Sequence, residues 1–294
     1  MWPRATERMY VQLMSKVQRL YPSTMKARSV KSKILIFLVE YEAQEEGLPT
    51  VSKVVCTDKT LLFAHFTKDG KFFVTATGKE AHIFETETYS IVKTISTEGY
   101  INKAFIMSSD KIAIINNKNK LEIYEGDNKT SDIKLSEEGL CLDFTADFST
   151  AVIGANRTKM FVVDIESQKV IHEETVGNKV TAILIANNQK LMAFGTGPGV
   201  VGFFDLEEKK VLSDTLKYHT NFVTTLAFTE DDTKCISGAY EDTMYVWNAE
   251  DFSRASKVTE VHRVSINQIV LASDGKVYTV GNDAFLKCWN GVLA

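Results

Sequence analysis

The chain of 294 residues is long enough to bury a sizeable core, and its 44% hydrophobic and 24% charged residues are typical of an ordinary globular composition. No apolar run approaches the ~20 residues that cross a membrane, so we expect no membrane span. The formal net charge is −4, and the chain after residue 33 holds 26 basic against 37 acidic residues, which argues against nucleic acid as a partner.

The first segment is the basic stretch of residues 1–32. Eight Lys or Arg residues stand within the first 33 positions against the single acid Glu7. Apolar residues there would line one face of a helix; they are Tyr10, Leu13, Met14, Val17, Leu20 and Tyr21. The acid-poor composition is also that of a mitochondrial presequence. We expect a mobile or helical extension over 1–32, followed by one domain over 33–294.

Short strand-like segments then recur along the chain. Each ends in an aromatic or apolar residue followed by a polar one, and these anchors are Phe84, Tyr124, Val163, Phe204, Trp247 and Trp289. Their spacings are 40, 39, 41, 43 and 42 residues. Such a period, with Val, Ile, Thr and aromatics in the strands and Gly, Asn and Asp between them, is typical of a repeat architecture.

The unit over 219–257 shows the content of one period most clearly. It reads FVTTLAFTEDD, KCISGAYED, TMYVWNAED and SRASKV, which are four strands separated by polar turns. Four strands in about 40–45 residues make one blade of a β-propeller, and a single blade cannot bury both of its faces. The sequence therefore predicts an all-β fold, a propeller of four-stranded antiparallel blades.

On these residues the chain resembles the WD-repeat family over roughly 33–290. The resemblance implies a structural set in each blade, in which a His, a Ser or Thr, an acid and the Trp share hydrogen bonds. The last two units carry such a set, with Glu241 where the family usually has Asp: His219, Ser237, Glu241 and Trp247, then His262, Thr279, Asp283 and Trp289. We expect these histidines to be structural, because buried polar atoms need partners.

Closure of the ring has two alternatives. The final unit supplies three strands before Ala294, so a fourth strand must come from elsewhere. KILIFLVEY (33–41) and VSKVVC (51–56) can supply it. If both belong to a first, incomplete blade that shares strands with the last, the ring has seven positions, which we prefer; if one is used, it has six.

The stretch GTGPGVVGFFD (195–205) carries the G-x-G-x-x-G spacing of a dinucleotide-binding loop. In that loop the glycines follow a strand and open a helix that holds the pyrophosphate. Here the strand-like VVGFFD follows instead, so we expect turn glycines and no cofactor site. The four scattered cysteines, Cys56, Cys141, Cys235 and Cys288, form no C-x-x-C pair, which favours a reducing compartment, a cytoplasmic location and no metal site.

Function is expected in the loops of one propeller face. A basic arc there joins Lys118, Lys120, Arg157, Lys159 and Lys179. An acidic arc lies across the ring at Glu241, Asp242 and Asp283, and the loops also offer the aromatic residues Tyr100, Tyr218, Phe222 and Tyr240. Aromatic residues beside Arg are typical of protein interfaces. These loops are the predicted partner-binding sites.

Three functional classes remain. The first is a non-enzymatic interaction scaffold that binds other proteins. The second follows from the last two units, which are similar to the C-terminal end of the two-propeller actin-interacting family and imply actin-filament disassembly with cofilin. The third follows from VTAILIANNQKLMAFGTGPGVVGFFDLEE (180–208), which resembles a WD-repeat exchange factor for the small GTPase of a membrane coat. That family has a C-terminal membrane span, and this chain ends in NGVLA. An enzyme is not expected, because no catalytic spacing is visible.

Overall fold

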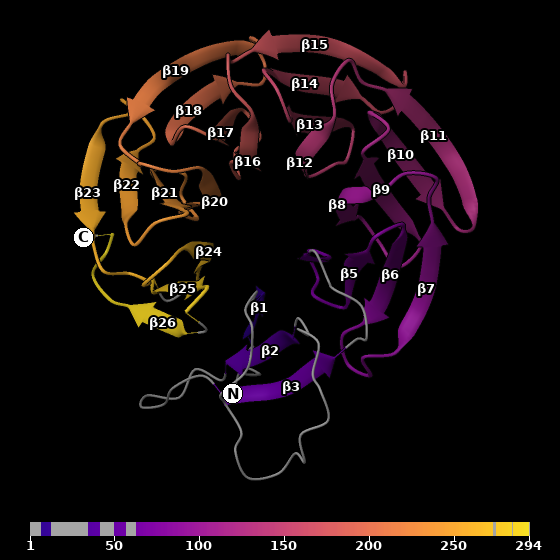
Figure 1. Ribbon diagram of the computed structural model, residues 1–294, viewed down its shortest axis with the longest axis horizontal. Coiled ribbons are helices and arrows are strands. Elements are labelled where there is room, and N and C mark those ends of the chain that lie inside the picture. The colour runs from indigo at the N-terminus through magenta and orange to yellow at the C-terminus, as the bar shows by residue number, and fades with distance from the viewer. Residues whose placement is uncertain are drawn as a thin grey trace, which may run out of the picture.

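The chain forms antiparallel sheets arranged around a central axis (Figure 1). The computed structural model describes residues 7–12, 35–41, 50–56, 63–272, 275–283 and 285–293. Within them, five sheets have four strands and two have three. In Figure 1 the first strand of each sheet lies innermost and the last strand lies outermost. The predicted all-β propeller is confirmed.

Six blades follow one another along the chain. Blade 1 contains β4 (Ala64–Phe66), β5 (Phe72–Thr77), β6 (Glu80–Glu85) and β7 (Ile91–Ser96). Blade 2 contains β8 (Ile101–Ile106), β9 (Lys111–Asn116), β10 (Lys120–Glu125) and β11 (Asn128–Lys134). Blade 3 contains β12 (Gly139–Phe144), β13 (Thr150–Ala155), β14 (Lys159–Asp164) and β15 (Lys169–Thr175).

The second half continues the same pattern. Blade 4 contains β16 (Val180–Ile185), β17 (Leu191–Thr196), β18 (Val200–Asp205) and β19 (Lys210–Lys217). Blade 5 contains β20 (Val223–Phe228), β21 (Lys234–Ala239), β22 (Met244–Asn248) and β23 (Arg254–Val258). Blade 6 contains β24 (Ile266–Leu271), β25 (Val277–Gly281) and β26 (Leu286–Trp289). All six predicted anchors lie on third strands, so the period read from the sequence is the period of the blades.

The N-terminal strands form a sheet of their own. It contains β1 (Glu7–Gln12), β2 (Leu35–Tyr41) and β3 (Thr50–Cys56), in the order β1-β2-β3. β1 lies beside β24, and Figure 1 shows this sheet between blade 6 and blade 1. Both strands offered for closure thus belong to one additional sheet. Among the described strands none is shared between this sheet and blade 6, contrary to the expected exchange.

One feature of the N-terminus differs from the sequence expectation. Residues 7–12 lie inside the segment expected to be mobile or helical, yet they form strand β1 and pair with β2 from Glu7 opposite Tyr41 to Gln12 opposite Ile36. The segment ERMYVQ is short and has no strict alternation of polar and apolar residues, so it carries no clear strand signal. The rest of residues 1–32 lies outside the described residues.

The hydrophobic core lies between blades. Each of the five large clusters draws its buried residues from two neighbouring blades. Tyr124 of blade 2, for example, packs into the cluster shared with blade 1, and the fully buried Trp247 of blade 5 packs into the cluster shared with blade 4. Burying one such side chain contributes roughly 1.5–3 kcal/mol. The blades stabilise one another by stacking.

Polar side chains near the start of the innermost strands form hydrogen bonds between neighbouring blades. Asn102 Nδ2 donates to Gly139 O at 2.8 Å, and Thr181 Oγ1 donates to Val223 O at 2.6 Å. Thr224 Oγ1 makes the equivalent bond from blade 5 to blade 6. Each donor is the second residue of its strand, so the bond repeats with the blade period.

Two sets of turns share one end of the sheets, which we call the upper face. They are the turns that lead into each first strand and those between second and third strands. The stretch GTGPGVVGFFD runs through such a turn, from the end of β17 into β18, as predicted. Gly199 has a φ of +86°, and a Cβ there would lie 2.3 Å from His219 O. Glycine is therefore required by the backbone of this turn and its close approach to blade 5.

Candidate functional site

The hydrogen-bonded set of blade 5 is closed on itself. Ser237 Oγ accepts the indole N–H of Trp247 at 2.8 Å and lies 2.7 Å from His219 Nε2. His219 Nδ1 lies 2.5 Å from Glu241 Oε1, and the other carboxylate oxygen accepts the backbone N–H of Thr220 at 2.9 Å. Because the indole can only donate, the arrangement is satisfied when the Ser237 hydroxyl donates to Nε2 and Nδ1–H donates to Glu241.

The carboxyl of Glu241 is held as an anion by these bonds. Burial alone would raise its pKa, but the hydrogen bonds from His219 and Thr220 outweigh burial and lower the pKa below its ordinary value. The side chain of Glu241 is 12% exposed and that of His219 is fully covered. Glutamate thus occupies the place that the WD-repeat pattern usually gives to aspartate.

Blade 6 carries the same arrangement with aspartate. His262 Nδ1 lies 2.8 Å from Asp283 Oδ1, and His262 Nε2 lies 2.9 Å from Thr279 Oγ1, which accepts Trp289 Nε1–H at 2.9 Å. The backbone N–H of Arg263 donates to Asp283 Oδ2 at 3.1 Å. Burial lowers the pKa of His262, although the hydrogen bond and the charge of Asp283 act in the opposite direction. Both histidines lie in networks that hold turns together.

Blade 2 uses a different polar set around its anchor. The hydroxyl of Tyr124 donates to Glu122 Oε2 at 3.1 Å, and Lys129 Nζ donates to Glu122 Oε1 at 3.3 Å. The carboxylate of Glu122 is only 1% exposed. Burial and the neighbouring Glu122 carboxylate raise the pKa of Tyr124 to about 12. The sequence pattern around this anchor showed an aromatic residue but not its buried ion pair.

The predicted basic arc divides into free and engaged cations. Lys118 and Arg157 are exposed in the upper-face turns of blades 2 and 3. Lys120 Nζ instead lies 2.9 Å from Asp132 on β11, and Lys159 Nζ lies 2.5 Å from Glu173 on β15. These acids lie on the outer strands, 12 and 14 residues further along the chain. Lys120 and Lys159 therefore neutralise carboxylates within their own blades.

Of the four predicted aromatic residues, Phe222 and Tyr240 come together on the upper face, whereas Tyr218 lies apart from them. The rings of Phe222 and Tyr240 stack with centroids 5.0 Å apart at 23°, and Lys179 Nζ lies 5.5 Å from the Phe222 centroid. The ring of Tyr218 packs elsewhere, 5.5 Å from Trp247 and 4.8 Å from the guanidinium of Arg254. Lys179, Phe222 and Tyr240 form one assembly that spans blades 4 and 5.

The carboxylates of the predicted acidic arc mostly accept hydrogen bonds from neighbouring side chains of their own blades. Glu241 and Asp283 hold His219 and His262, as described above. The carboxylate of Asp283 is 6% exposed, and Asp242 Oδ1 accepts the hydroxyl of Thr243 at 2.8 Å. These carboxylates stabilise the turns of blades 5 and 6.

Three titratable side chains on innermost strands were not among the predicted site residues. His65 lies on β4, Lys103 on β8 and Asp143 on β12. Burial lowers the pKa of His65 to about 3 and also lowers that of Lys103, while burial raises the pKa of Asp143 to about 6 although two backbone N–H groups donate to it. The signal was a charged residue within a strand segment that is otherwise mostly apolar.

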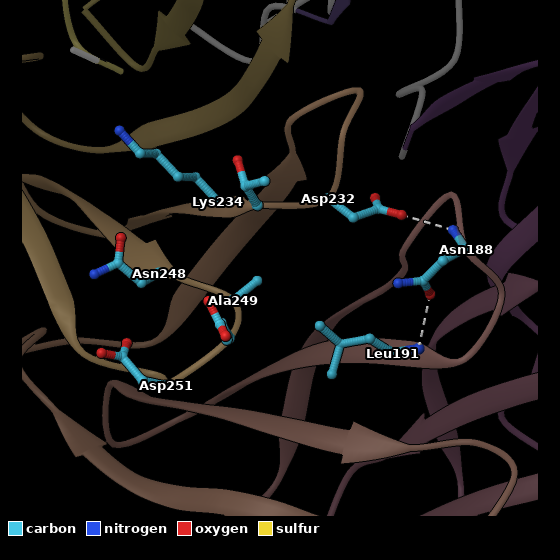
Figure 2. A pocket seen from close by; sticks show the side chains of 9 residues that line it. Asn188, Leu191, Asp232, Lys234, Asn248, Ala249 and Asp251 are labelled. Atoms are coloured by element: carbon cyan, nitrogen blue, oxygen red, sulfur yellow. Dashed lines mark hydrogen bonds between the residues drawn. The ribbon is translucent and has the colours of Figure 1, made fainter.

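The lower face carries a hollow of about 410 Å³ between blades 4 and 5 (Figure 2). Its rim is made by turns, and the polar groups there bond within these turns and from one turn to the next. Asp232 Oδ2 accepts the N–H of Asn188 at 2.6 Å, Asn188 Oδ1 accepts that of Leu191 at 3.1 Å, and Asp251 Oδ1 accepts that of Ser253 at 2.9 Å. No group of three or more His, Cys, Asp or Glu residues that could hold a metal occurs in the described part of the chain.

Comparisons with known proteins agree with the architecture. The chain is similar to the 66 kDa stress protein of Physarum polycephalum, with 21% identity over 60% of this chain and 30% of that protein. It is similar to actin-interacting protein 1 of Caenorhabditis elegans, with 19% identity over 55% of this chain and 28% of that protein. A p21-activated protein kinase-interacting protein 1-like protein of Xenopus laevis is 27% identical over 40% of this chain and 31% of that protein.

The matched region is thus about 30% of the length of each of these relatives. Among the described residues, no helix has the length and apolar character needed to cross a membrane. The family model described as "Nucleolar protein 10-like, N-terminal domain" matches residues 59–291, which include all six blades. The chain belongs to this family of WD-repeat β-propellers.

Proposed function

We propose that this chain is a non-enzymatic platform that binds other proteins through the turns of its upper face. One observation carries the proposal. The histidines and carboxylates of blades 5 and 6 are closed into hydrogen-bond networks, whereas the cations of Lys118, Arg157 and Lys179 and the ring of Tyr240 face outward. Groups presented in this way can contact a partner, and aromatic and Arg side chains dominate interface energies.

Affinity purification with the full chain as bait tests the proposal. One control bait carries Lys118→Glu, Arg157→Glu and Lys179→Glu. A second bait carries the same change of charge on exposed lysines at the lower-face turns, namely Lys68→Glu, Lys169→Glu and Lys210→Glu. Partners that are retained by the lower-face variant and lost with the upper-face variant support the platform. If the same partners are retained by both variants, the upper face is not the binding surface.

A specific partner is suggested by one similarity. The relative named actin-interacting protein 1 shares 19% identity over 168 residues, and the complete structural sets of blades 5 and 6 are those that suggested this family from sequence. The second candidate function is therefore binding of actin filaments together with cofilin. Cosedimentation of the chain with filamentous actin, with and without cofilin, tests it. A chain that stays in the supernatant in both cases excludes this function.

Cellular location is part of the proposal. The scattered cysteines favour a reducing compartment, and the buried thiols of Cys141 and Cys235 are unpaired. Both the cytoplasm and the nucleus provide such conditions, and the matching family description contains the word nucleolar. We retain a cytoplasmic location as the proposal. A fluorescent fusion of the full chain distinguishes it from a nucleolar one.

A further inference from the structure

The assembly of Lys179, Phe222 and Tyr240 is built to hold its shape. The stacked rings are joined through the backbone, since Tyr240 N–H donates to Phe222 O at 3.0 Å. Tyr240 remains 40% exposed although one face of its ring is covered by Phe222. The ammonium of Lys179 lies over the ring of Phe222, which favours a fixed position for the charge.

A glycine of the GTGPGVVGFFD stretch makes room for this lysine. A Cβ at Gly197 would lie 2.7 Å from Lys179 Cε and 2.9 Å from Lys179 Cγ, so the aliphatic stem lies flat across the turn between β17 and β18. A stem that is already packed loses less rotamer freedom when its ammonium binds a ligand. The absence of a side chain at Gly197 therefore leaves space for the stem of Lys179.

A second aromatic and cationic assembly lies at blades 1 and 2. Tyr100 is 59% exposed, and Lys79 Nζ lies 5.4 Å from its ring centroid. Asn117 Oδ1 accepts the backbone N–H of Tyr100 at 2.9 Å, and the stem of Lys118 passes Gly99, where a Cβ would lie 3.0 Å from Lys118 Cγ. Arg157 of blade 3 is exposed between the two assemblies. We call Lys79, Lys118, Arg157 and Lys179 the upper cation row.

The carboxylates of Glu137 and Glu138 in the same sector accept hydrogen bonds from other residues of this chain. Glu137 accepts the backbone N–H of Thr158 at 2.9 Å and its hydroxyl at 3.0 Å. Glu138 accepts from Asn102 Nδ2 at 2.8 Å and from Asn156 Nδ2 at 3.1 Å. Within the described residues, no carboxylate lies at ion-pair distance from a member of the upper cation row. Cations and aromatic rings are therefore the groups that this sector presents outward.

We propose that the upper cation row binds an acidic peptide segment of a partner protein, with a bulky apolar side chain of that segment against Tyr240. Carboxylates complement the unpaired cations, and the exposed face of a tyrosine accepts an apolar or aromatic side chain. The inference rests on the proposed function and deepens it by naming the chemistry of the partner. Nucleic acid is disfavoured because it carries one negative charge per nucleotide along its whole length, and a chain with a formal net charge of −4 repels such a polymer beyond the four cations of the row.

Fluorescence polarisation with a defined probe tests the inference. The probe is a labelled short peptide of alternating Glu and Asp with a Trp at each end, and the comparison probes are the same peptide with Lys for each acid and an oligouridine of similar length. Binding of the acidic probe to the full chain is expected, with a loss of at least about tenfold in Lys179→Gln and in Tyr240→Ala. Lys68→Gln and Lys210→Gln should leave the affinity unchanged.

Several outcomes overturn the inference. They are failure of the acidic probe to bind, tighter binding of the oligouridine, and equal binding by Lys179→Gln and Lys68→Gln. Thermal unfolding of each variant excludes loss of fold as the cause of weak binding. The proposed function fails separately, when the wild-type bait retains no partner in the affinity purification. If the Lys179→Gln and Tyr240→Ala baits retain the same partners as the wild-type bait, the proposed platform is supported and the acidic-peptide site is contradicted.

Discussion

Ser237 Oγ accepts the indole N–H of Trp247 at 2.8 Å, and this single oxygen joins the second and third strands of blade 5 to the turn that carries His219. All three side chains are buried. The oxygen therefore satisfies two buried nitrogen atoms that have no access to water. The WD-repeat pattern in the sequence predicted that Ser237, Trp247 and His219 share hydrogen bonds, and the structure shows that one hydroxyl makes both of them.

Ser237→Ala is expected to lower the free energy of unfolding by about 1–3 kcal/mol, because it leaves the Trp247 N–H and His219 Nε2 without a partner. Urea unfolding followed by tryptophan fluorescence measures the change. Ser167→Ala, at an exposed position between β14 and β15, serves as the control and should stay within about 0.5 kcal/mol of wild type. Equal effects of the two substitutions would show that the Ser237 bond contributes nothing.

Gly199→Ala and Gly177→Ala separate two costs of replacing a glycine. Both residues have a positive φ, +86° and +75°, but a Cβ at Gly199 would collide with His219 O whereas nothing lies within 4 Å of a Cβ at Gly177. We expect Gly177→Ala to cost about 1 kcal/mol from backbone strain. Gly199→Ala should cost about 1–3 kcal/mol more, from the collision. Chemical unfolding of both variants checks this, and similar midpoints would contradict the close approach.

The blade pattern was readable from sequence because its signal is local and repeated. An anchor such as Tyr124 or Phe204 stands at the same place in every unit, flanked by strand residues and turn residues with their own preferences. The structural sets of blades 5 and 6 were readable for the same reason, since His, Ser or Thr, acid and Trp recur in order. Local propensity and the global fold agree at these positions.

The chemistry of the surface could be predicted only in part, because it depends on contacts between side chains that do not recur from one repeat to the next. Lys118 and Lys120 look alike in NNKNK, yet Lys120 reaches Asp132 on the outer strand and Lys118 does not. Tyr218 and Phe222 stand four residues apart, yet their rings lie in different surroundings. Alternation along a strand and the place of its neighbours decide such outcomes, and the sequence shows neither directly.

His65 is expected to make stability sensitive to acid. Burial lowers its folded pKa to about 3, while the unfolded chain binds a proton near the ordinary value of about 6.5. The unfolded state therefore binds more protons between these values, and the contribution of His65 is complete above pH 6.5 and declines as the pH falls towards 3. The slope is at most about 1.4 kcal/mol per pH unit.

His65→Phe isolates this effect, because phenylalanine can keep the ring contact with Phe105, whose centroid is 4.0 Å away. The difference in unfolding free energy between wild type and variant should shrink or reverse as the pH falls from 6.5 to 4. The comparison is needed because Asp143, with its pKa raised to about 6, acts in the opposite sense between pH 6 and about 4. A difference that is constant across this range would contradict a neutral, half-buried His65.

The ion pair of Glu122 and Lys129 can be tested with a double-mutant cycle. Lys129→Met removes the cation from a carboxylate that is 1% exposed, and we expect a loss of about 1–3 kcal/mol, since the buried acceptor keeps only the Tyr124 hydroxyl. Glu122→Gln retains an oxygen that can accept from Tyr124 and should cost less. The double variant should lose less than the sum of the two, by about 0.5 kcal/mol or more.

A second readout of the same cycle does not depend on stability. The pKa of Tyr124, raised to about 12 by burial and by the Glu122 carboxylate, should fall towards its ordinary value in Glu122→Gln, because the neighbouring negative charge is removed while burial remains. Ultraviolet titration of the folded chain measures this ionisation, and Tyr124→Phe identifies the signal. Additive losses together with an unchanged tyrosine titration would show that the Glu122 carboxylate does not act on Lys129 or Tyr124, and would contradict the ion pair.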